Sequence, residues 1–390
     1  MGNRPIKVVH ILEGFLGGTC TYVCTVLPQL VQKGFDVTLI CSLNRCCPDA
    51  AERISALRKS GVTVYIIPMY RKINPLNDFR SVAVIRRLLL QNKFDVIHTH
   101  CSKAGALGRI AAVLAGRNVV VHSPHCFAFL RCNNRFNRLL YLVLEQLLGR
   151  LTSRLVAVSR SEAAIAIRAR VVSRGKCNWV ENGLANGRVF PSATGFARDF
   201  TGKVSIDLPR DKAVVTTACR LVSYKGIFRF LEAARVSRAN DVVFLLAGDG
   251  NLKTAAERFI FENRLSNKVK LLGHISNMEQ IYAISDIVAL CSDAEAQPYL
   301  LLEAMRAMCP IVATSVIGNR ELIAHDKTGF LAEPTPASIA AAIDQLLADK
   351  AKRRAYAENA YIYFCRHHSL EKQISRLTEI YESCIRDGQA

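Results

Sequence analysis

Two carboxylates lie eight positions apart in SDAEAQPYLLLEAMRA, residues 292–307, at Glu295 and Glu303. An ionised carboxylate only accepts hydrogen bonds and can accept from two hydroxyl groups at once, which suits the vicinal diol of a ribose or a hexose. The preceding apolar run predicts a strand, and the run after Pro298 predicts a helix, so both carboxylates can face one ligand. A plainer interpretation stays open: Glu303 is an ordinary helix residue and Glu295 a first-turn acid favoured by the helix dipole.

Two cations lie in a similar position earlier in the chain. Arg220 and Lys225 occur in ACRLVSYKG, between an apolar run and a helix predicted from about Ile227. The arginine offers a planar fork, the lysine a point charge, and the helix N-terminus free N–H groups, so this turn suits a phosphate. Because Lys and Arg are common in turns, the spacing alone does not require a phosphate site.

Glycines separate the first predicted strand from the first predicted helix. Gly14, Gly17 and Gly18 let a ligand approach the backbone closely at a helix start. They do not form GxGxxG, and GxxxxGK[ST] does not occur in the sequence, which disfavours a classical nicotinamide enzyme and a P-loop kinase.

Histidines cluster in the first half of the chain. His98 and His100 end one predicted strand, and His122 and His125 end the next. A neutral histidine can polarise a hydroxyl or bind a metal, but each of these could also be a satisfied structural residue. His125 is the best functional candidate, since it follows Pro124 at the end of its strand. Few carboxylates lie nearby and the 14 cysteines form no CxxC pair, so we predict reduced cysteines and no metal site.

The elements that must position these residues alternate along the whole chain. Short β-branched apolar runs are followed by helix-like segments, a pattern typical of parallel sheets covered on both faces. At 390 residues the chain suits two such α/β domains, each doubly wound. Several runs end in polar or glycine-rich residues, and ligands of open parallel sheets bind beyond those carboxyl ends. We therefore expect two domains, and we expect the polar and glycine-rich strand ends of both to form the walls of one cleft.

The predicted boundaries follow from composition. Residues 1–182 form the N-terminal domain, and residues 183–212, rich in Gly, Pro and Ser, are the expected linker. Residues 213–365 form the C-terminal domain, and residues 366–390 are an amphipathic helix expected to pack back across the domains.

The net charge of +20 lies almost entirely in the first half of the chain. Residues 1–182 contain 26 Lys and Arg against 9 Asp and Glu, whereas residues 183–390 contain 26 against 23. Within residues 126–176, ten basic side chains face two acidic ones. Such a surface attracts nucleic acid, anionic lipid headgroups or a phosphorylated substrate, although a merely solvated basic face is also consistent with it.

In order and spacing, these motifs resemble family 4 of the retaining glycosyltransferases, which has the GT-B fold. The resemblance covers nearly the whole chain, and the pair of glutamates is its most specific part. It is carried by the glycine turn, HTHCSKAGALGRIAA, HSPHCFAF, AVSRSE, VENG, RLVSYKG, LLAGDG, LLGHI, EAQPYLLLEAM, PIVATSVIGNREL and KTGFL. The first-half motifs are most similar to members that build bacterial exopolysaccharide, capsule or lipopolysaccharide.

The resemblance implies two Rossmann-like domains facing a central cleft, and a role for each candidate residue. Arg220 and Lys225 would hold the pyrophosphate of a UDP- or GDP-linked sugar, Glu303 its ribose, and Glu295 the transferred hexose. His125 would lie at the reacting anomeric centre. The further donor contacts implied are Gly17, Gly18, Gly248, Gly273, His274, Ile275, Gln297, Pro298, Tyr299 and Leu300. Many relatives have Gly-Phe-Gly after the first glutamate, where this chain has Ala296, Gln297, Pro298 and Tyr299, so the identity of the sugar is open.

The predicted function is retaining hexosyl transfer to a glycan or a polyprenyl-diphosphate-linked acceptor, without a cofactor or a divalent metal, because Arg220 and Lys225 can neutralise the departing diphosphate. The chain contains no run of the roughly 20 apolar residues needed to span a membrane. We therefore expect a cytoplasmic protein held peripherally on an anionic inner membrane face through residues 126–176. Two alternatives stay open: a nucleotide-sugar epimerase of similar architecture, and a basic nucleic-acid-binding protein, which would leave the glutamate pair unexplained.

Overall fold

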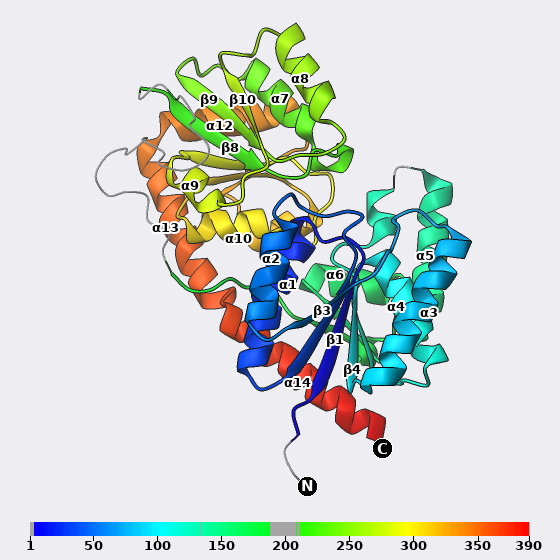
Figure 1. The fold of residues 1–390 in the computed structure, drawn as a ribbon. Helices are drawn as coiled ribbons and strands as arrows, with labels where there is room; N and C mark the ends of the chain where they lie inside the picture. Colours follow the sequence, from blue (N-terminus) through cyan, green and yellow to red (C-terminus); the bar gives the residue numbers. More distant parts are fainter. Residues whose placement is uncertain (1–3, 133, 188–207, 209–210, 390) are drawn as a thin grey trace. The chain divides into compact units, whose positions relative to one another are not determined.

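The computed structural model describes residues 4–132, 134–187, 208 and 211–389 of the chain (Figure 1). The chain divides into two compact units: unit 1 is Met1–Gly183 with Leu370–Ala390, and unit 2 is Leu184–Ser369. Most of the linker expected at 183–212 falls on residues 188–207, 209 and 210, which lie outside the described part.

Unit 1 contains a seven-stranded, fully parallel sheet in the order β3-β2-β1-β4-β5-β6-β7. Its strands are β1 (Lys7–Leu12), β2 (Asp36–Cys41), β3 (Thr63–Ile66), β4 (Val96–His100), β5 (Val120–Ser123), β6 (Arg154–Ala157) and β7 (Cys177–Trp179). The order reverses between β1 and β4, whose register sets His10 beside His98. The doubly wound topology predicted from the sequence is confirmed.

Helices connect the strands of unit 1 and cover its sheet (Figure 1). They are α1 (Gly17–Gln32), α2 (Ala50–Lys59), α3 (Pro75–Asn92), α4 (Ser102–Leu114), α5 (Arg135–Gly149), α6 (Arg160–Arg168), α14 (Leu370–Gln389) and the short 3-10 turns η1 (Ala128–Arg131) and η2 (Arg174–Lys176). Side chains of Asn74, Asn134 and Ser159 cap α3, α5 and α6 by accepting first-turn N–H groups.

Unit 2 contains a second parallel sheet, in the order β10-β9-β8-β11-β12-β13, which reverses between β8 and β11. Its strands are β8 (Ala213–Ala218), β9 (Val242–Ala247), β10 (Val269–Gly273), β11 (Ile287–Leu290), β12 (Ile311–Thr314) and β13 (Phe330–Ala332). Its helices are η3 (Ser223–Lys225), α7 (Ile227–Val236), α8 (Lys253–Glu262), α9 (Met278–Ala283), α10 (Tyr299–Arg306), α11 (Ile317–Leu322), α12 (Pro336–Ala348) and α13 (Lys350–His367).

The chain leaves and re-enters unit 1 at neighbouring points. Leu184, the first residue of unit 2, forms an isolated parallel bridge with Ser369, its last residue. Beyond this point α14 packs on α1 and β4 of unit 1 and buries Ile374, Leu377 and Tyr381. The last helix of the chain therefore completes the core of the first unit.

No helix in the described part of the chain combines the length and apolarity needed to cross a bilayer.

Candidate functional site

The candidate phosphate and sugar contacts of unit 2 lie where the strand order reverses. Arg220 and Lys225 follow β8, and Glu295 follows β11, the strand that pairs with β8. In an open parallel sheet the loops after two such strands diverge to opposite faces and leave room for a ligand at their carboxyl ends. The structure thus brings Arg220 and Lys225 to the same sheet edge as Glu295. Glu295 lies 70 positions after Lys225 in the sequence.

Close backbone contact holds the two loops together at Gly226. This residue has a φ of +68°, and a Cβ here would lie 1.9 Å from the carbonyl oxygen of Cys291. Arg229 of α7 donates to that same carbonyl oxygen at 2.5 Å and to the carboxylate of Asp293 at 2.6 Å. The N–H of Asp293 donates in turn to the carbonyl of Tyr224 at 2.8 Å. Only glycine fits at position 226 in this arrangement.

Lys225 and Glu295 form an ion pair at this junction. The Lys225 ammonium donates to Glu295 Oε1 at 2.5 Å, and the two side chains are 18% and 9% exposed. Burial lowers the pKa of Lys225, but the charge of Glu295 and the Tyr224 phenol outweigh it, so the pKa is raised overall. Lys225 is therefore a cation at neutral pH that already has a carboxylate partner.

Arg220 lies beside the same pair. Its guanidinium donates to the Tyr224 hydroxyl and lies 5.8 Å from the centre of that ring, while the Lys225 ammonium lies 5.6 Å from it. Tyr224 thus contacts both cations, and the turn presents two positive charges around one aromatic ring.

Glu303 lies on α10 and has a partner that the sequence did not reveal. The hydroxyl of Tyr282, from α9, donates to Glu303 Oε2 at 2.6 Å. Burial and the nearby Glu303 carboxylate raise the pKa of Tyr282 well above its ordinary value, so the phenol stays protonated and acts as a donor. Tyr282 fixes the orientation of the carboxylate proposed for a ribose.

The loop between the two glutamates leads directly into α10. Pro298 is the N-cap, and in the described part of unit 2 no side chain caps the helix. Gln297, Tyr299 and Leu300 are buried, and the N–H groups of the first turn of α10 have no acceptor within the helix itself. Behind this loop a Cβ at Gly318 would lie 2.4 Å from the Glu295 carbonyl oxygen, which shows how tightly α11 supports it.

The remaining donor-contact candidates of unit 2 follow β9 and β10. The N–H of Gly248 donates to the carbonyl of Gly273 at 2.6 Å, and both glycines have positive φ, at +136° and +68°. A Cβ at Gly248 would lie 1.9 Å from the Cys219 carbonyl oxygen, just before Arg220. His274 and Ile275 continue from Gly273 and are half-buried.

In unit 1 the glycine turn and His125 follow β1 and β5. Gly17, with φ +60°, and Gly18 are the exposed first residues of α1. His125 and Cys126 both have positive φ, at +50° and +75°, which costs about 1–2 kcal/mol for each residue that is not glycine.

A buried carboxylate stabilises this strained turn. Glu162 of α6, 2% exposed, accepts the N–H of Cys126 at 2.5 Å and the N–H of Val158 at 2.9 Å. Charge-assisted hydrogen bonds of this kind are about twice as strong as neutral ones. Glu162 therefore fixes the backbone next to His125 through its hydrogen bond from the N–H of Cys126.

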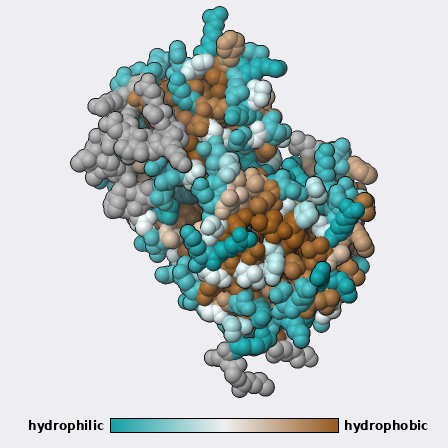
Figure 2. Space-filling model, viewed as in Figure 1, coloured by the Kyte–Doolittle hydropathy of each residue, from teal (hydrophilic) through white to brown (hydrophobic). Residues whose placement is uncertain are grey.

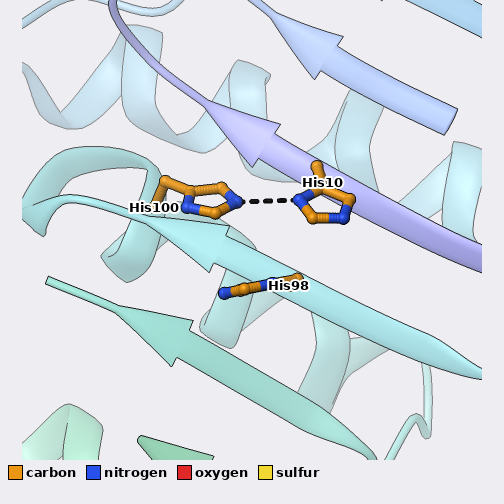
Figure 3. A group of neighbouring side chains, drawn as sticks. All are labelled: His10, His98 and His100. Carbon is orange, nitrogen blue, oxygen red and sulfur yellow. Dashed lines mark hydrogen bonds between the residues drawn. The ribbon is translucent and has the colours of Figure 1, made fainter. Parts of the chain in front are cut away.

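Three further histidines lie buried beside His125. His10, His98 and His100 have ring nitrogens within 4.8 Å of one another, a spacing that could suit a metal ion (Figure 3). However, His10 Nδ1 and His100 Nε2 are hydrogen-bonded at 2.9 Å, and His98 bonds to Tyr381 and Ser123. The nitrogens that would bind a metal are thus engaged in a hydrogen-bonded network, and no carboxylate of the described residues belongs to the group.

The surface of unit 1 includes an exposed apolar stripe on α5. The stripe repeats at helical spacing and consists of Phe136, Leu139, Leu140, Val143 and Leu147, which are 38–73% exposed. Arg135, Arg138 and Arg150 are exposed on the same helix or at its end. Figure 2 shows apolar side chains among hydrophilic ones on one face of unit 1.

The opposite face of α5 is fixed by a buried ion pair. Arg109 of α4 donates to Glu145 at 2.9 Å, and both side chains are almost fully buried. Burial lowers the pKa of Arg109, and the Glu145 carboxylate partly offsets this effect. The apolar stripe is therefore presented by a helix that is firmly attached to unit 1.

Sequence reasoning missed Tyr282, Glu162 and Tyr381. Glu162 does carry a signal, because Ser159 and Glu162 have the spacing of a capping box, and the Ser159 hydroxyl accepts the N–H of Glu162 at 3.1 Å. Tyr282 and Tyr381 lie on amphipathic helices, where an inward tyrosine is indistinguishable from an ordinary core residue.

Comparisons with known proteins identify the two halves of the chain. Residues 17–183 match the family described as glycosyl transferase 4-like domain, and residues 201–363 match glycosyl transferases group 1. A similar curated relative is the UDP-Gal:alpha-D-GlcNAc-diphosphoundecaprenol alpha-1,3-galactosyltransferase of Escherichia coli, 30% identical over 338 residues and 85% of each chain. The capsular polysaccharide biosynthesis glycosyltransferase CapM of Staphylococcus aureus is 23% identical over 76% of this chain and 78% of its own.

Solved structures agree on the fold. The Anabaena protein HepE, crystallised with UDP and glucose, has a TM-score of 0.81 at 21% identity, over 97% of this chain and all of its own. With the coverage of the Escherichia coli relative and the two parallel sheets, this shows that the chain belongs to the family 4-type glycosyltransferases of the GT-B fold.

Proposed function

We propose that this glycosyltransferase transfers a hexosyl unit, with retention of anomeric configuration, from a UDP- or GDP-linked sugar to a glycan or a polyprenyl-diphosphate-linked acceptor in surface polysaccharide synthesis. The observation that carries the proposal is the ion pair of Lys225 and Glu295 at the reversal point of the unit 2 sheet, with Arg220 beside it. The name of the Escherichia coli relative, which includes a UDP-sugar and a diphosphoundecaprenol acceptor, supports the substrate classes.

The roles of the residues follow from their chemistry. Arg220 and Lys225 stabilise the negative charge that builds on the diphosphate as the sugar departs, so that no divalent metal is required. Glu303, oriented by Tyr282, accepts hydrogen bonds from the ribose, and Glu295 accepts them from the transferred sugar. Gly17, Gly18 and His125 act from unit 1, with His125 at the anomeric centre. Gly248, Gly273, His274 and Ile275 line the nucleotide.

The membrane part of the proposal rests on α5. An amphipathic helix with an exposed apolar stripe and flanking arginines lies in the interface of an anionic membrane. Phe136 and Leu139, 73% and 60% exposed, supply the apolar contact, and the basic residues of 126–176 supply the attraction. We propose peripheral attachment to the inner face of the cell membrane, where a lipid-linked acceptor lies within reach.

The decisive experiment is a transfer assay with a panel of UDP- and GDP-sugars and a polyprenyl-diphosphate-linked acceptor, in the presence of a metal chelator. The proposal expects a product whose new linkage has the anomeric configuration of the donor. Lys225→Ala and Glu303→Ala should each reduce transfer by about a hundredfold or more, whereas the exposed Lys350→Ala and Glu262→Ala serve as matched controls.

Several outcomes would contradict the proposal. Full activity in Lys225→Ala or Glu303→Ala would overturn the site, and inversion would overturn the retaining mechanism. Interconversion of the donor sugar without any acceptor would identify an epimerase instead.

A further inference from the structure

Unit 1 contains a continuous hydrogen-bonded chain that runs from the backbone of β6 to His125. Its members are Val156, Ser123, His98, Tyr381, His10, His100 and His125. The rings of His10, His98 and His100 lie together at the carboxyl ends of β1 and β4 (Figure 3), and Tyr381 reaches them from α14. Because a neutral imidazole has one donor and one acceptor nitrogen, the direction of each bond constrains the next.

The direction is set at the Val156 end. A carbonyl oxygen only accepts, so the Ser123 hydroxyl donates its proton to Val156 at 2.8 Å. The oxygen of Ser123 must then accept from His98 Nε2, 2.9 Å away. This leaves His98 Nδ1 as an acceptor, and the Tyr381 hydroxyl, at 2.5 Å, is the donor to it.

The bond directions are set in the same way from Tyr381 to His125. With its proton given to His98, the Tyr381 oxygen accepts from His10 Nε2 at 3.4 Å. His10 Nδ1 then accepts from His100 Nε2 at 2.9 Å, and His100 Nδ1 accepts from His125 Nε2 at 2.9 Å. A reversal at any link would set two N–H groups or two lone pairs against each other, which is costly among buried groups.

The four rings are neutral because of their environment. Burial lowers the pKa of His125 to about 4, and burial together with His125 lowers that of His10 to about 3. The pKa values of His98 and His100 are also well below the ordinary range, chiefly because of burial. At neutral pH each ring therefore carries one proton.

We propose that Ser123, His98, Tyr381, His10 and His100 are positioning residues that hold His125 in its Nε2–H tautomer, with the lone pair on Nδ1. The four histidines of this hydrogen-bonded network then share this tautomer. His125 faces a bound sugar as a hydrogen-bond acceptor through Nδ1, and the last helix of the chain helps to set this state. The assignment of His125 to the reacting centre rests on the proposed function, whereas the tautomer does not.

The test uses the full chain with both ring nitrogens of histidine isotopically labelled, and reads the tautomer of each ring by NMR at neutral pH. His10, His98, His100 and His125 should all be Nε2–H. Tyr381→Phe keeps the aromatic ring but removes the hydroxyl, so His10 and, through it, His100 and His125 should become tautomer mixtures. His122 does not belong to this network, since its Nδ1 pairs with the Thr99 hydroxyl at 3.0 Å, so its tautomer should not change.

A second variant keeps the inference testable if Tyr381→Phe does not fold. Ser123→Ala removes the first side chain of the network, so His98 and then His10, His100 and His125 should become tautomer mixtures. In both variants kcat for transfer should fall by about twofold to tenfold, in proportion to the lost fraction of the Nε2–H form, with KM changed less.

The tautomer measurements decide the inference independently of the enzymatic assignment. An Nδ1–H or charged His125 in the unaltered chain would overturn it, as would a single unchanged tautomer in both variants. If the rings behave as expected while no sugar is transferred, the inference stands and the proposed function fails. Zinc that binds to the unaltered chain and shifts all three signals of His10, His98 and His100 would overturn it in favour of a metal site.

Discussion

The ammonium of Lys225 lies 2.5 Å from the carboxylate of Glu295, so the cation proposed for a phosphate already has a negative partner before any ligand binds. A carboxylate at this distance competes with phosphate for the same hydrogen-bond donor and repels its charge. The negative charge of Glu295 should therefore weaken nucleotide binding and favour sugar binding.

This conflict predicts a divided effect of Glu295→Gln. The amide keeps the size of the side chain but removes its charge, so UDP should bind about three- to tenfold more tightly while sugar transfer decreases by at least tenfold. Titration calorimetry with UDP and the transfer assay measure the two effects, with the exposed Glu262→Gln as the control. Weaker UDP binding would show that Glu295 helps Lys225 rather than competing with phosphate.

The contact between Gly226 and Cys291 predicts a strong local effect of one methyl group. Gly226→Ala adds a Cβ 1.9 Å from a carbonyl oxygen at a φ of +68°, and should lower the free energy of unfolding by about 3 kcal/mol or more. Gly116→Ala has a similar φ of +63° with nothing within 4 Å, so it should cost only about 1 kcal/mol. Denaturant unfolding measures both, and equal losses would contradict the steric explanation.

The strained turn at His125 predicts a role for Glu162 in stability and in transfer. Glu162→Gln replaces one acceptor oxygen by an NH₂ group that faces a backbone N–H, and should cost about 2–3 kcal/mol of unfolding free energy. Because His125 loses its support, kcat should also fall, by about tenfold. Glu52→Gln, at an exposed position of α2, is the control, and an unchanged stability of Glu162→Gln would refute the role.

The buried neutral histidines predict acid sensitivity. Their folded pKa values, about 3 for His10 and about 4 for His125, lie below the ordinary value of 6.5. The unfolded chain therefore binds more protons below pH 6.5, and stability should fall as the pH drops from 6.5 towards 4, by up to about 1.4 kcal/mol per pH unit for each such histidine. Urea unfolding across this range tests it. His10→Gln should reduce the slope, whereas the exposed His367→Gln should not.

The stripe on α5 predicts membrane binding through two separable contributions. Phe136→Ser with Leu139→Ser should weaken binding to vesicles by about tenfold or more, and Arg135→Gln with Arg138→Gln should do so only when the vesicles contain anionic lipid. Sedimentation with neutral and anionic vesicles measures both, with the exposed Ile362→Ser of unit 2 as control. Equal binding of the unaltered chain to both vesicle types would remove the electrostatic part.

Much of the fold could be predicted from the sequence because apolar runs and helical segments are local patterns. The runs that predict β8, β11 and their loops correctly placed Arg220, Lys225 and Glu295 at strand ends. The three-residue β13 was not predicted, since Phe330, Leu331 and Ala332 include no β-branched residue.

The partners of the candidate residues were harder to foresee. Tyr282 meets Glu303 across 21 positions, and Tyr381 meets His98 across 283. Such contacts depend on how helices pack, and a single sequence gives no local sign of them. Glu162 is a different case, because the spacing of Ser159 and Glu162 indicates a helix cap. The spacing does not indicate that the Glu162 carboxylate also accepts a hydrogen bond from a turn 36 positions away.

The position of α14 also has a consequence for how the chain folds during synthesis. Unit 2 is one continuous segment, from Leu184 to Ser369, so all of it is synthesised before α14. All seven strands of unit 1 precede unit 2, but the space around His10 and His98 stays open until α14 packs there. The second unit can thus mature before the first, the reverse of their order along the messenger RNA.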